Sequence, residues 1–236
     1  MLSKEQSEWF RNKLSELENE MGVDDTTGET GTLKELALAR EQNIKSKSPI
    51  ESILNTALAI NWKWTIAKPR IDRFLREFPE INSLEKLDRT LARLDARTFA
   101  KKYLNIKVNT KKPDVNPKYQ MLKSLCSAFL NYQRVHKLQT ETEALHHWAK
   151  QVDLSDLKHD SIGGITGVGP AAVQNLRLCL GYNVAKPDRH VERVLAQLFC
   201  LKIRWYQFPE LANDVGLSEL YLDKVLYEYG RNKENL

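Results

Sequence analysis

The segment from Gly163 to Leu195 constrains this chain most, because a glycine turn there leads directly into one helix and a capped second helix follows. Its centre reads ITGVGP and ends at Pro170, and proline suits a first helical position because its missing N–H needs no partner there. The two glycines allow a tight turn and leave amides at a helix N-terminus uncovered by side chains. Such a terminus attracts phosphate. The sequence therefore predicts an anion-binding turn.

The segment PDRHVERVL predicts the second helix, with apolar side chains at positions 191, 194, 195 and 198. Asp188 precedes this helix and therefore occupies its N-cap, where aspartate is common for structural reasons alone. The helix N-terminus favours an ionised carboxylate, and burial among apolar residues favours the protonated form. The sequence leaves open which effect is larger.

A glycine hairpin followed by aspartate in an apolar-Asp-x-His-Val context resembles the helix-hairpin-helix (HhH-GPD) superfamily of base-excision DNA glycosylases. The resemblance is clearest over residues 160–198, extends from about residue 48 to the C-terminus, and does not cover residues 1–45. It implies an all-α, two-lobed fold. The expected parts are an N-terminal helical extension over 1–45, a discontinuous lobe of 46–65 plus 183–236, and a helical-barrel lobe over 66–182 that contains the hairpin at about 154–181.

The resemblance also implies a reaction. Releasing a base from deoxyribose passes through a cation-like sugar, which a fixed carboxylate can stabilise while it activates water. Asp188 stands at the position of that carboxylate. Members that also cut the strand carry a lysine where this chain has Ala171, so a monofunctional glycosylase is expected. A lysine borrowed from elsewhere, such as Lys186, is the alternative, although the motif assigns Lys186 no role.

Backbone groups of the hairpin would hold the DNA beside the lesion, by the same resemblance. The amides expected to bind phosphates belong to Gly167, Gly169 and Ala171. The carbonyls expected to bind a monovalent cation (K⁺ or Na⁺) belong to Gly163, Ile165 and Val168. Backbone contacts of this kind carry no sequence information.

Two polar segments are candidates for contacts with the extruded base and the duplex. Asn61, Trp62 and Trp64 follow the first core helix, where relatives border the base pocket; aromatics there could stack on a flipped base. The alternative is that both tryptophans are core residues, as most tryptophans are. The loop entering the helix after residue 116 offers wedge candidates, although a solvated basic loop is the plainer alternative. These candidates are Asn116, Lys118 and Tyr119.

Composition sets wider bounds. Helix caps recur and apolar alternation never lasts, which predicts an all-α chain with a flexible loop over 22–31. A helix over 154–160 and a C-cap at Gly230 are also expected. The net charge of +5 and pI near 9.0 lean modestly towards polyanions. No run of residues is apolar enough for a membrane span, and the start lacks a signal-peptide core.

We therefore expect an intracellular monomer, in the cytoplasm and nucleoid or in a nucleus, acting on double-stranded DNA without a required cofactor. The three dispersed cysteines predict no disulfide framework and no zinc site, and they cannot form the four-cysteine iron–sulfur site of many relatives. Alkylated purines are the leading substrate, because tryptophans would stack well on a cationic base. Deaminated, mispaired or oxidised bases remain open. The alternatives are a non-catalytic DNA-binding or scaffold protein, and a helical interaction module in which the hairpin is incidental.

Overall fold

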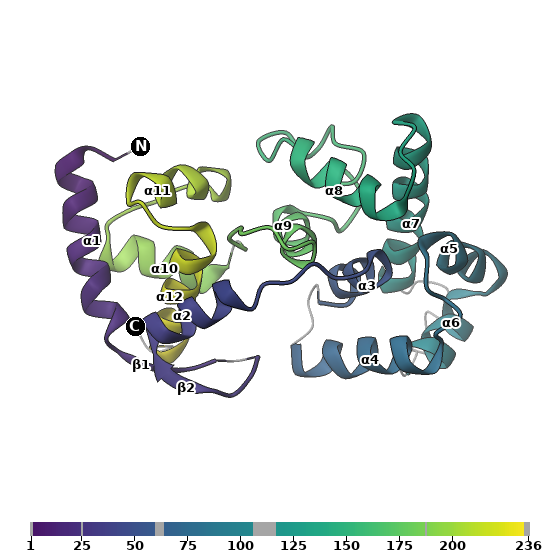
Figure 1. The fold of residues 1–236 in the computed structure, drawn as a ribbon, viewed down its shortest axis with the longest axis horizontal. Coiled ribbons are helices and arrows are strands. Elements are labelled where there is room, and N and C mark those ends of the chain that lie inside the picture. Colours follow the sequence, from purple (N-terminus) through teal and green to yellow (C-terminus); the bar gives the residue numbers. More distant parts are fainter. Residues whose placement is uncertain (1, 25, 60–63, 106–116, 187, 234–236) are drawn as a thin grey trace. The chain divides into compact units, whose positions relative to one another are not determined.

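The computed structural model describes residues 2–24, 26–59, 64–105, 117–186 and 188–233. Within these ranges twelve α-helices account for most of the chain, so the expected all-α class is confirmed. None of the helices described there is both long and apolar enough to cross a lipid bilayer. The chain forms two compact units: unit 1 comprises Met1–Lys45 and Gly181–Leu236, and unit 2 comprises Ser46–Leu180 (Figure 1).

This division differs from the expected lobes at residues 46–65. Most of that segment forms the helix α3 (Pro49–Ala59). This helix packs against three helices of unit 2, namely α4 (Trp64–Glu77), α7 (Pro117–Val135) and α9 (Pro170–Cys179). Nearly every side chain of α3 is buried, so the helix is a core element of unit 2 rather than part of a lobe with 183–236. Residues 1–45, expected as an added extension, belong instead to the same compact unit as the C-terminal segment.

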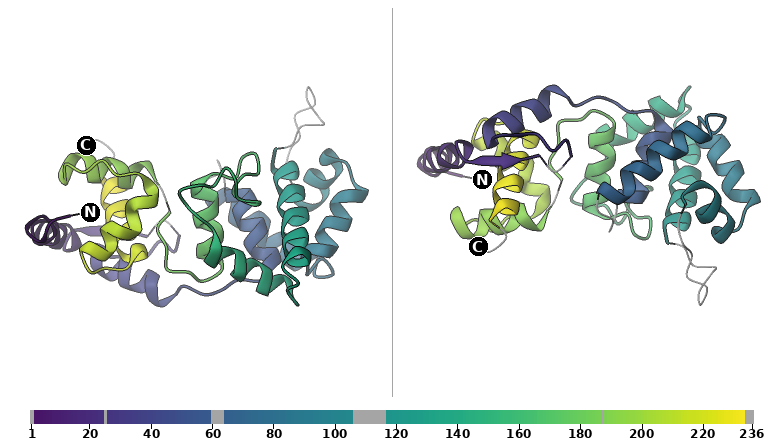
Figure 2. Two further views of the ribbon diagram at one scale, coloured as in Figure 1. Left: turned by 90° about the horizontal axis from the view of Figure 1, so that it is seen from above. Right: turned by 90° about the horizontal axis from the view of Figure 1, so that it is seen from below.

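Unit 1 is organised around α12 (Glu219–Asn232). This helix packs against α2 (Leu33–Gln42) and α10 (Arg189–Leu198), and the three lie together in all views (Figures 1 and 2). Phe10 of the N-terminal helix stacks on Phe199 with ring centroids 4.0 Å apart. The remaining elements are α1 (Lys4–Glu18), β1 (Met21–Val23), β2 (Thr30–Thr32), a 3₁₀ turn η1 (Trp205–Gln207) and α11 (Phe208–Asp214).

The expected flexible loop over 22–31 was wrong in part, because its ends form the antiparallel pair β1 and β2. Tertiary contacts fix this hairpin. Asp24 accepts hydrogen bonds from the Thr26 and Thr27 amides at 2.7 and 2.8 Å and pairs with Lys224 of α12 at 2.8 Å. The residues around this hairpin give no strand signal, because Lys224, which anchors it through Asp24, lies about 200 positions further along the chain.

Gly230 lies inside α12, so its expected role as a C-cap was wrong. A Cβ at this position would lie 2.9 Å from the His190 carbonyl oxygen of α10 and 2.9 Å from a Val194 methyl group. The glycine is needed because the two helix backbones approach closely there. This contact brings the N-terminal turn of α10 against α12.

Unit 2 contains α3 to α9. The elements not yet given are α5 (Leu84–Arg93), α6 (Ala96–Tyr103) and α8 (Glu141–Gln151). The long helix α7 packs on α3, α5, α6 and α8. Its Phe129 meets Trp148 of α8 edge-on at 5.3 Å, inside the apolar core of the unit.

Candidate functional site

The glycine turn of unit 2 has the predicted form. Gly169 is the N-cap of α9 and Pro170 its first residue. Gly167 has φ +89°, a left-handed conformation that favours glycine, and a Cβ there would also lie 2.7 Å from the Met121 Sδ-methyl carbon. The Val168 amide donates to the Ile165 carbonyl at 2.8 Å and closes the turn.

Gly169 has no such structural requirement. Its φ of −97° is open to any residue, and a Cβ there would meet nothing within 4 Å. Among the described residues, no acceptor was found for the backbone N–H groups of Gly167, Gly169 or Ala171. A side chain at position 169 would stand in front of these amides. The glycine thus leaves a half-exposed group of backbone donors accessible from solvent.

Asp160 holds this turn in place, and sequence reasoning missed it. Its carboxylate accepts the indole N–H of Trp148 at 3.0 Å and the amides of Ile162 and Gly163 at 2.9 and 2.6 Å. These bonds replace the helix expected over 154–160 by a series of turns, so that expectation was wrong. Asp–x–x–Gly is a turn signal that could have indicated the bend, but the Trp148 contact is tertiary.

The cation site expected at the carbonyls of Gly163, Ile165 and Val168 stays a prediction. The Ile165 carbonyl already accepts one hydrogen bond from Val168, which leaves a second lone pair. Across the described ranges, no group of His, Cys, Asp and Glu side chains is arranged to hold a metal. A site built from backbone carbonyls would not depend on such a group.

Asp188 is the N-cap of α10, as predicted. Its Oδ1 accepts the His190 amide at 2.7 Å, and no donor to its Oδ2 was found among the described residues. The half-buried carboxylate lines a small, partly open cavity within unit 1, of about 20 Å³. The apolar wall of this cavity consists of Ala185, Val191, Leu195, Ile203, Trp205 and Phe208.

A second carboxyl group, Asp223 of α12, lines the same cavity together with Lys186 and Glu192. Burial raises the pKa of Asp223 to about 8, the charge of Asp188 adds to the rise, and a backbone hydrogen bond from Lys186 and the charges of Lys186 and Lys224 oppose it. Sequence reasoning missed Asp223, because an aspartate on an amphipathic helix carries no local signal of a site.

The side chains of His190 and Arg193 are engaged with α12. Arg193 donates to the Gly230 carbonyl at 2.6 Å and lies 3.3 Å from His190 Nδ1, and the His190 ring packs edge-on against Tyr227. Only the backbone of His190 reaches Asp188. The histidine ring therefore helps to join α10 to α12.

Two of the three wedge candidates, Lys118 and Tyr119, are buried in the structure. The Lys118 ammonium group is buried and donates to the carbonyls of Ala57 and Leu58 at 2.9 and 3.4 Å, at the C-terminal end of α3. The buried Tyr119 hydroxyl lies 2.7 and 2.8 Å from the carbonyls that end α5 and accept from it. Both side chains tie α7 to other helices of unit 2, so neither can enter a duplex without breaking the core.

The third wedge candidate, Asn116, and the base-pocket candidates Asn61 and Trp62 lie outside the described residues. Trp64 is half-buried at the start of α4. Its indole N–H is buried, and no acceptor was found for it in the described part of the chain. A donor in this state is compatible with a role in binding.

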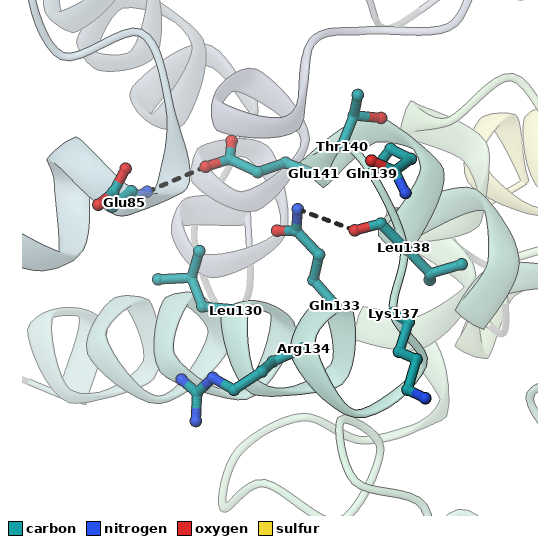
Figure 3. Close-up of a pocket in the computed structure, with 9 residues that line it drawn as sticks. All are labelled: Glu85, Leu130, Gln133, Arg134, Lys137, Leu138, Gln139, Thr140 and Glu141. Atoms are coloured by element: carbon teal, nitrogen blue, oxygen red, sulfur yellow. Dashed lines mark hydrogen bonds between the residues drawn. The ribbon is translucent and has the colours of Figure 1, made fainter.

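A larger hollow, of about 620 Å³, lies between α5, α7 and α8 of unit 2 (Figure 3). One of its two carboxylates, that of Glu141, accepts hydrogen bonds from the amides of Leu84 and Glu85 at 2.8 and 3.1 Å. Arg134 of α7 and Lys137, which follows α7, extend away from that carboxylate (Figure 3). The Glu141 carboxylate therefore caps the start of α5, and the residues around the hollow present no convergent set of reactive groups.

No family model matches this chain, and neither a curated protein nor a solved structure was found that matches it.

Proposed function

We propose that this protein is a monofunctional DNA glycosylase that hydrolyses the N-glycosidic bond of a damaged or mispaired base. The observation that carries the proposal is the Asp188 carboxylate. One of its oxygens is fixed by the first turn of α10, the other accepts no bond from the described residues, and both belong to a residue that lines a largely apolar cavity. A carboxylate held in this way can stabilise a cation-like sugar and accept a proton from water.

The glycine turn of unit 2 supports the DNA-binding part of the proposal. The unpaired amides of Gly167, Gly169 and Ala171 and the positive end of the α9 dipole suit phosphate oxygens. The open space at Gly169 allows close approach of a sugar–phosphate backbone. Exposed Arg189 and Lys202 offer further phosphate contacts beside α10.

Ala171 at the position of the lysine of strand-cutting enzymes supports hydrolysis without a covalent intermediate. Alkylated purines are the proposed substrates, since Trp62 and Trp64 would stack on a cationic base. Base flipping would bring the nucleotide to the carboxylate, as in other enzymes that act on a base.

A second candidate is a non-catalytic DNA-binding protein. The volume of the Asp188 cavity favours it, because about 20 Å³ holds one water molecule and no base. An aspartate N-cap would also persist after loss of activity.

Base release from a panel of duplexes, each with one alkylated, deaminated, oxidised or mispaired base, separates the two. The panel is treated with wild type, Asp188→Asn and Asp95→Asn, then cleaved with alkali. Asp95 is a matched control, because it caps α6 through the Thr98 amide at 2.8 Å as Asp188 caps α10. Release by wild type and Asp95→Asn but not by Asp188→Asn supports the glycosylase. Salt-sensitive DNA binding without release from any duplex supports the binder.

A further inference from the structure

The carboxyl group of Asp223 lies in surroundings that disfavour an ionised aspartate. It lies on α12 between the buried residues Leu222 and Val225, and its Oδ1 is out of contact with solvent and has no hydrogen-bond partner among the described residues. An ionised oxygen in this state is unfavourable, since no donor among the described residues replaces the water that it has lost. An apolar side chain would fill the position without that cost.

The surroundings of Asp223 contain both signs of charge. Asp188 and Glu192 face it from the start of α10, Lys186 from the segment before α10, and Lys224 from α12 itself. Lys224 is already paired with Asp24 and Glu228 at 2.8 and 2.6 Å. Its charge is thus largely compensated, and the negative charge of Asp188 meets Asp223 across a cavity with apolar walls.

Two carboxyl groups that share a poorly solvated site cannot both ionise at low cost, and the more buried one retains its proton. The group with a buried oxygen here is Asp223, whose Oδ1 is out of contact with solvent and whose pKa is raised to about 8. A protonated carboxyl group is a hydrogen-bond donor. The cavity between the two groups has a volume of about 20 Å³, which is sufficient for one bridging water.

We propose that Asp223 is a positioning residue for Asp188, which keeps its proton at neutral pH and donates it in a hydrogen bond, directly or through one water, to the Asp188 carboxylate. The pair then carries one negative charge, on the group fixed by the His190 amide. This inference rests on the proposed glycosylase function for its consequence in catalysis, and on the fold alone for its protonation state.

The first experiment measures single-turnover base release by wild type, Asp223→Asn and Asp223→Leu from pH 5 to 10. Asparagine keeps a donor and cannot ionise, and leucine has no donor. We expect Asp223→Asn to release the base at least about 10-fold faster than Asp223→Leu, the effect of a hydrogen bond to a charged group. Wild type should slow as pH rises through about 8, when Asp223 ionises, and Asp223→Asn should not. Equal rates for the two variants, or the same alkaline slowing in Asp223→Asn, would overturn the proposal.

The second experiment needs no activity. A carboxyl whose pKa is higher in the folded than in the unfolded chain stabilises the protein fully below the unfolded value of 3.8, and that stabilisation is lost as pH rises to about 8. Urea unfolding should show this loss in wild type and not in Asp223→Asn; Asp188→Asn should show it over a narrower pH window. The same pH dependence in wild type and Asp223→Asn contradicts the assignment. If wild type releases no base but shows this difference, the glycosylase proposal fails and the protonated Asp223 stands.

Discussion

The glycine turn of unit 2 and the carboxyl cavity of unit 1 are both placed at helix N-termini, and they use those termini in opposite ways. At α9 the N-cap is a glycine, and the amides of Gly169 and Ala171 have no acceptor in the part of the chain that the structure describes. At α10 the N-cap is an aspartate whose own carboxylate accepts a hydrogen bond from the His190 amide. The first terminus is arranged to receive an anion from outside, whereas the second fixes an anion that belongs to the chain.

The two regions also differ in what holds them. The turn at α9 is held by hydrogen bonds from the Trp148 indole and two backbone amides to the Asp160 carboxylate within unit 2. The cavity at α10 is formed by contact with α12, with Gly230 permitting the close approach. Mutations in the turn should therefore change binding and leave the pH dependence alone, and mutations at the cavity should do the reverse.

The largest expected effect is the loss of chemistry in Asp188→Asn. Asparagine can still cap α10 but carries no charge, so base release should fall by about 100- to 1000-fold or more. Binding to DNA should remain, because the substitution changes neither the amides of the glycine turn nor the cationic side chains of Arg189 and Lys202. Single-turnover release and fluorescence anisotropy measure the two quantities. Unchanged release would remove the carboxylate mechanism.

Gly169→Asp tests the N-terminus of α9, where the backbone amides are proposed to bind phosphate. A side chain in the open space at Gly169 puts a negative charge in front of the free amides, and DNA affinity should fall by about 10-fold or more for all sequences alike. Gly169→Ser separates bulk from charge and should weaken binding less. Thr140→Asp adds the same charge at the exposed N-cap of α8 and serves as the control. Equal losses from both aspartate variants would mean that net charge alone is responsible.

Asp160→Ala tests how the turn is held. The substitution leaves the Trp148 indole N–H and two amides without their acceptor, and we expect a loss of about 1–3 kcal/mol of unfolding free energy. Asp156→Ala removes an exposed carboxylate that contacts only a neighbouring histidine, and should change stability by less than about 0.5 kcal/mol. Urea denaturation compares them. Similar losses for the two variants would show that Asp160 contributes nothing specific.

The smallest expected effect concerns acid stability. Burial by itself raises the pKa of Asp24, but the bonds from Lys224, Thr27 and Thr26 outweigh it and hold the pKa at about 2. The resulting stabilisation, about 2 kcal/mol at most, is present above pH 3.8 and is lost as pH falls towards 2. Hydrogen exchange at pH 3 should show unit 1 losing protection first, and Asp24→Asn should show that loss already at neutral pH. Earlier loss in unit 2 would contradict the expectation.

Features that depend on a few neighbouring residues could be predicted from the sequence. The all-α class, the turn closed at Gly167, the start of α9 at Pro170 and the N-cap at Asp188 all follow from contacts within about four positions along the chain. Local rules of turn and cap chemistry were sufficient for them.

The tertiary structure decided everything that depends on distant partners. From the sequence, Lys118 and Tyr119 were candidates for wedge residues. In the structure both are buried against backbone carbonyls that lie about 60 and 25–28 positions away along the chain, which local patterns do not reveal. Asp223 joins the cavity of Asp188 only because α10 and α12 pack closely. A side chain's charge state depends on burial and on charges brought near by the fold, and the order of residues along a chain does not encode these directly.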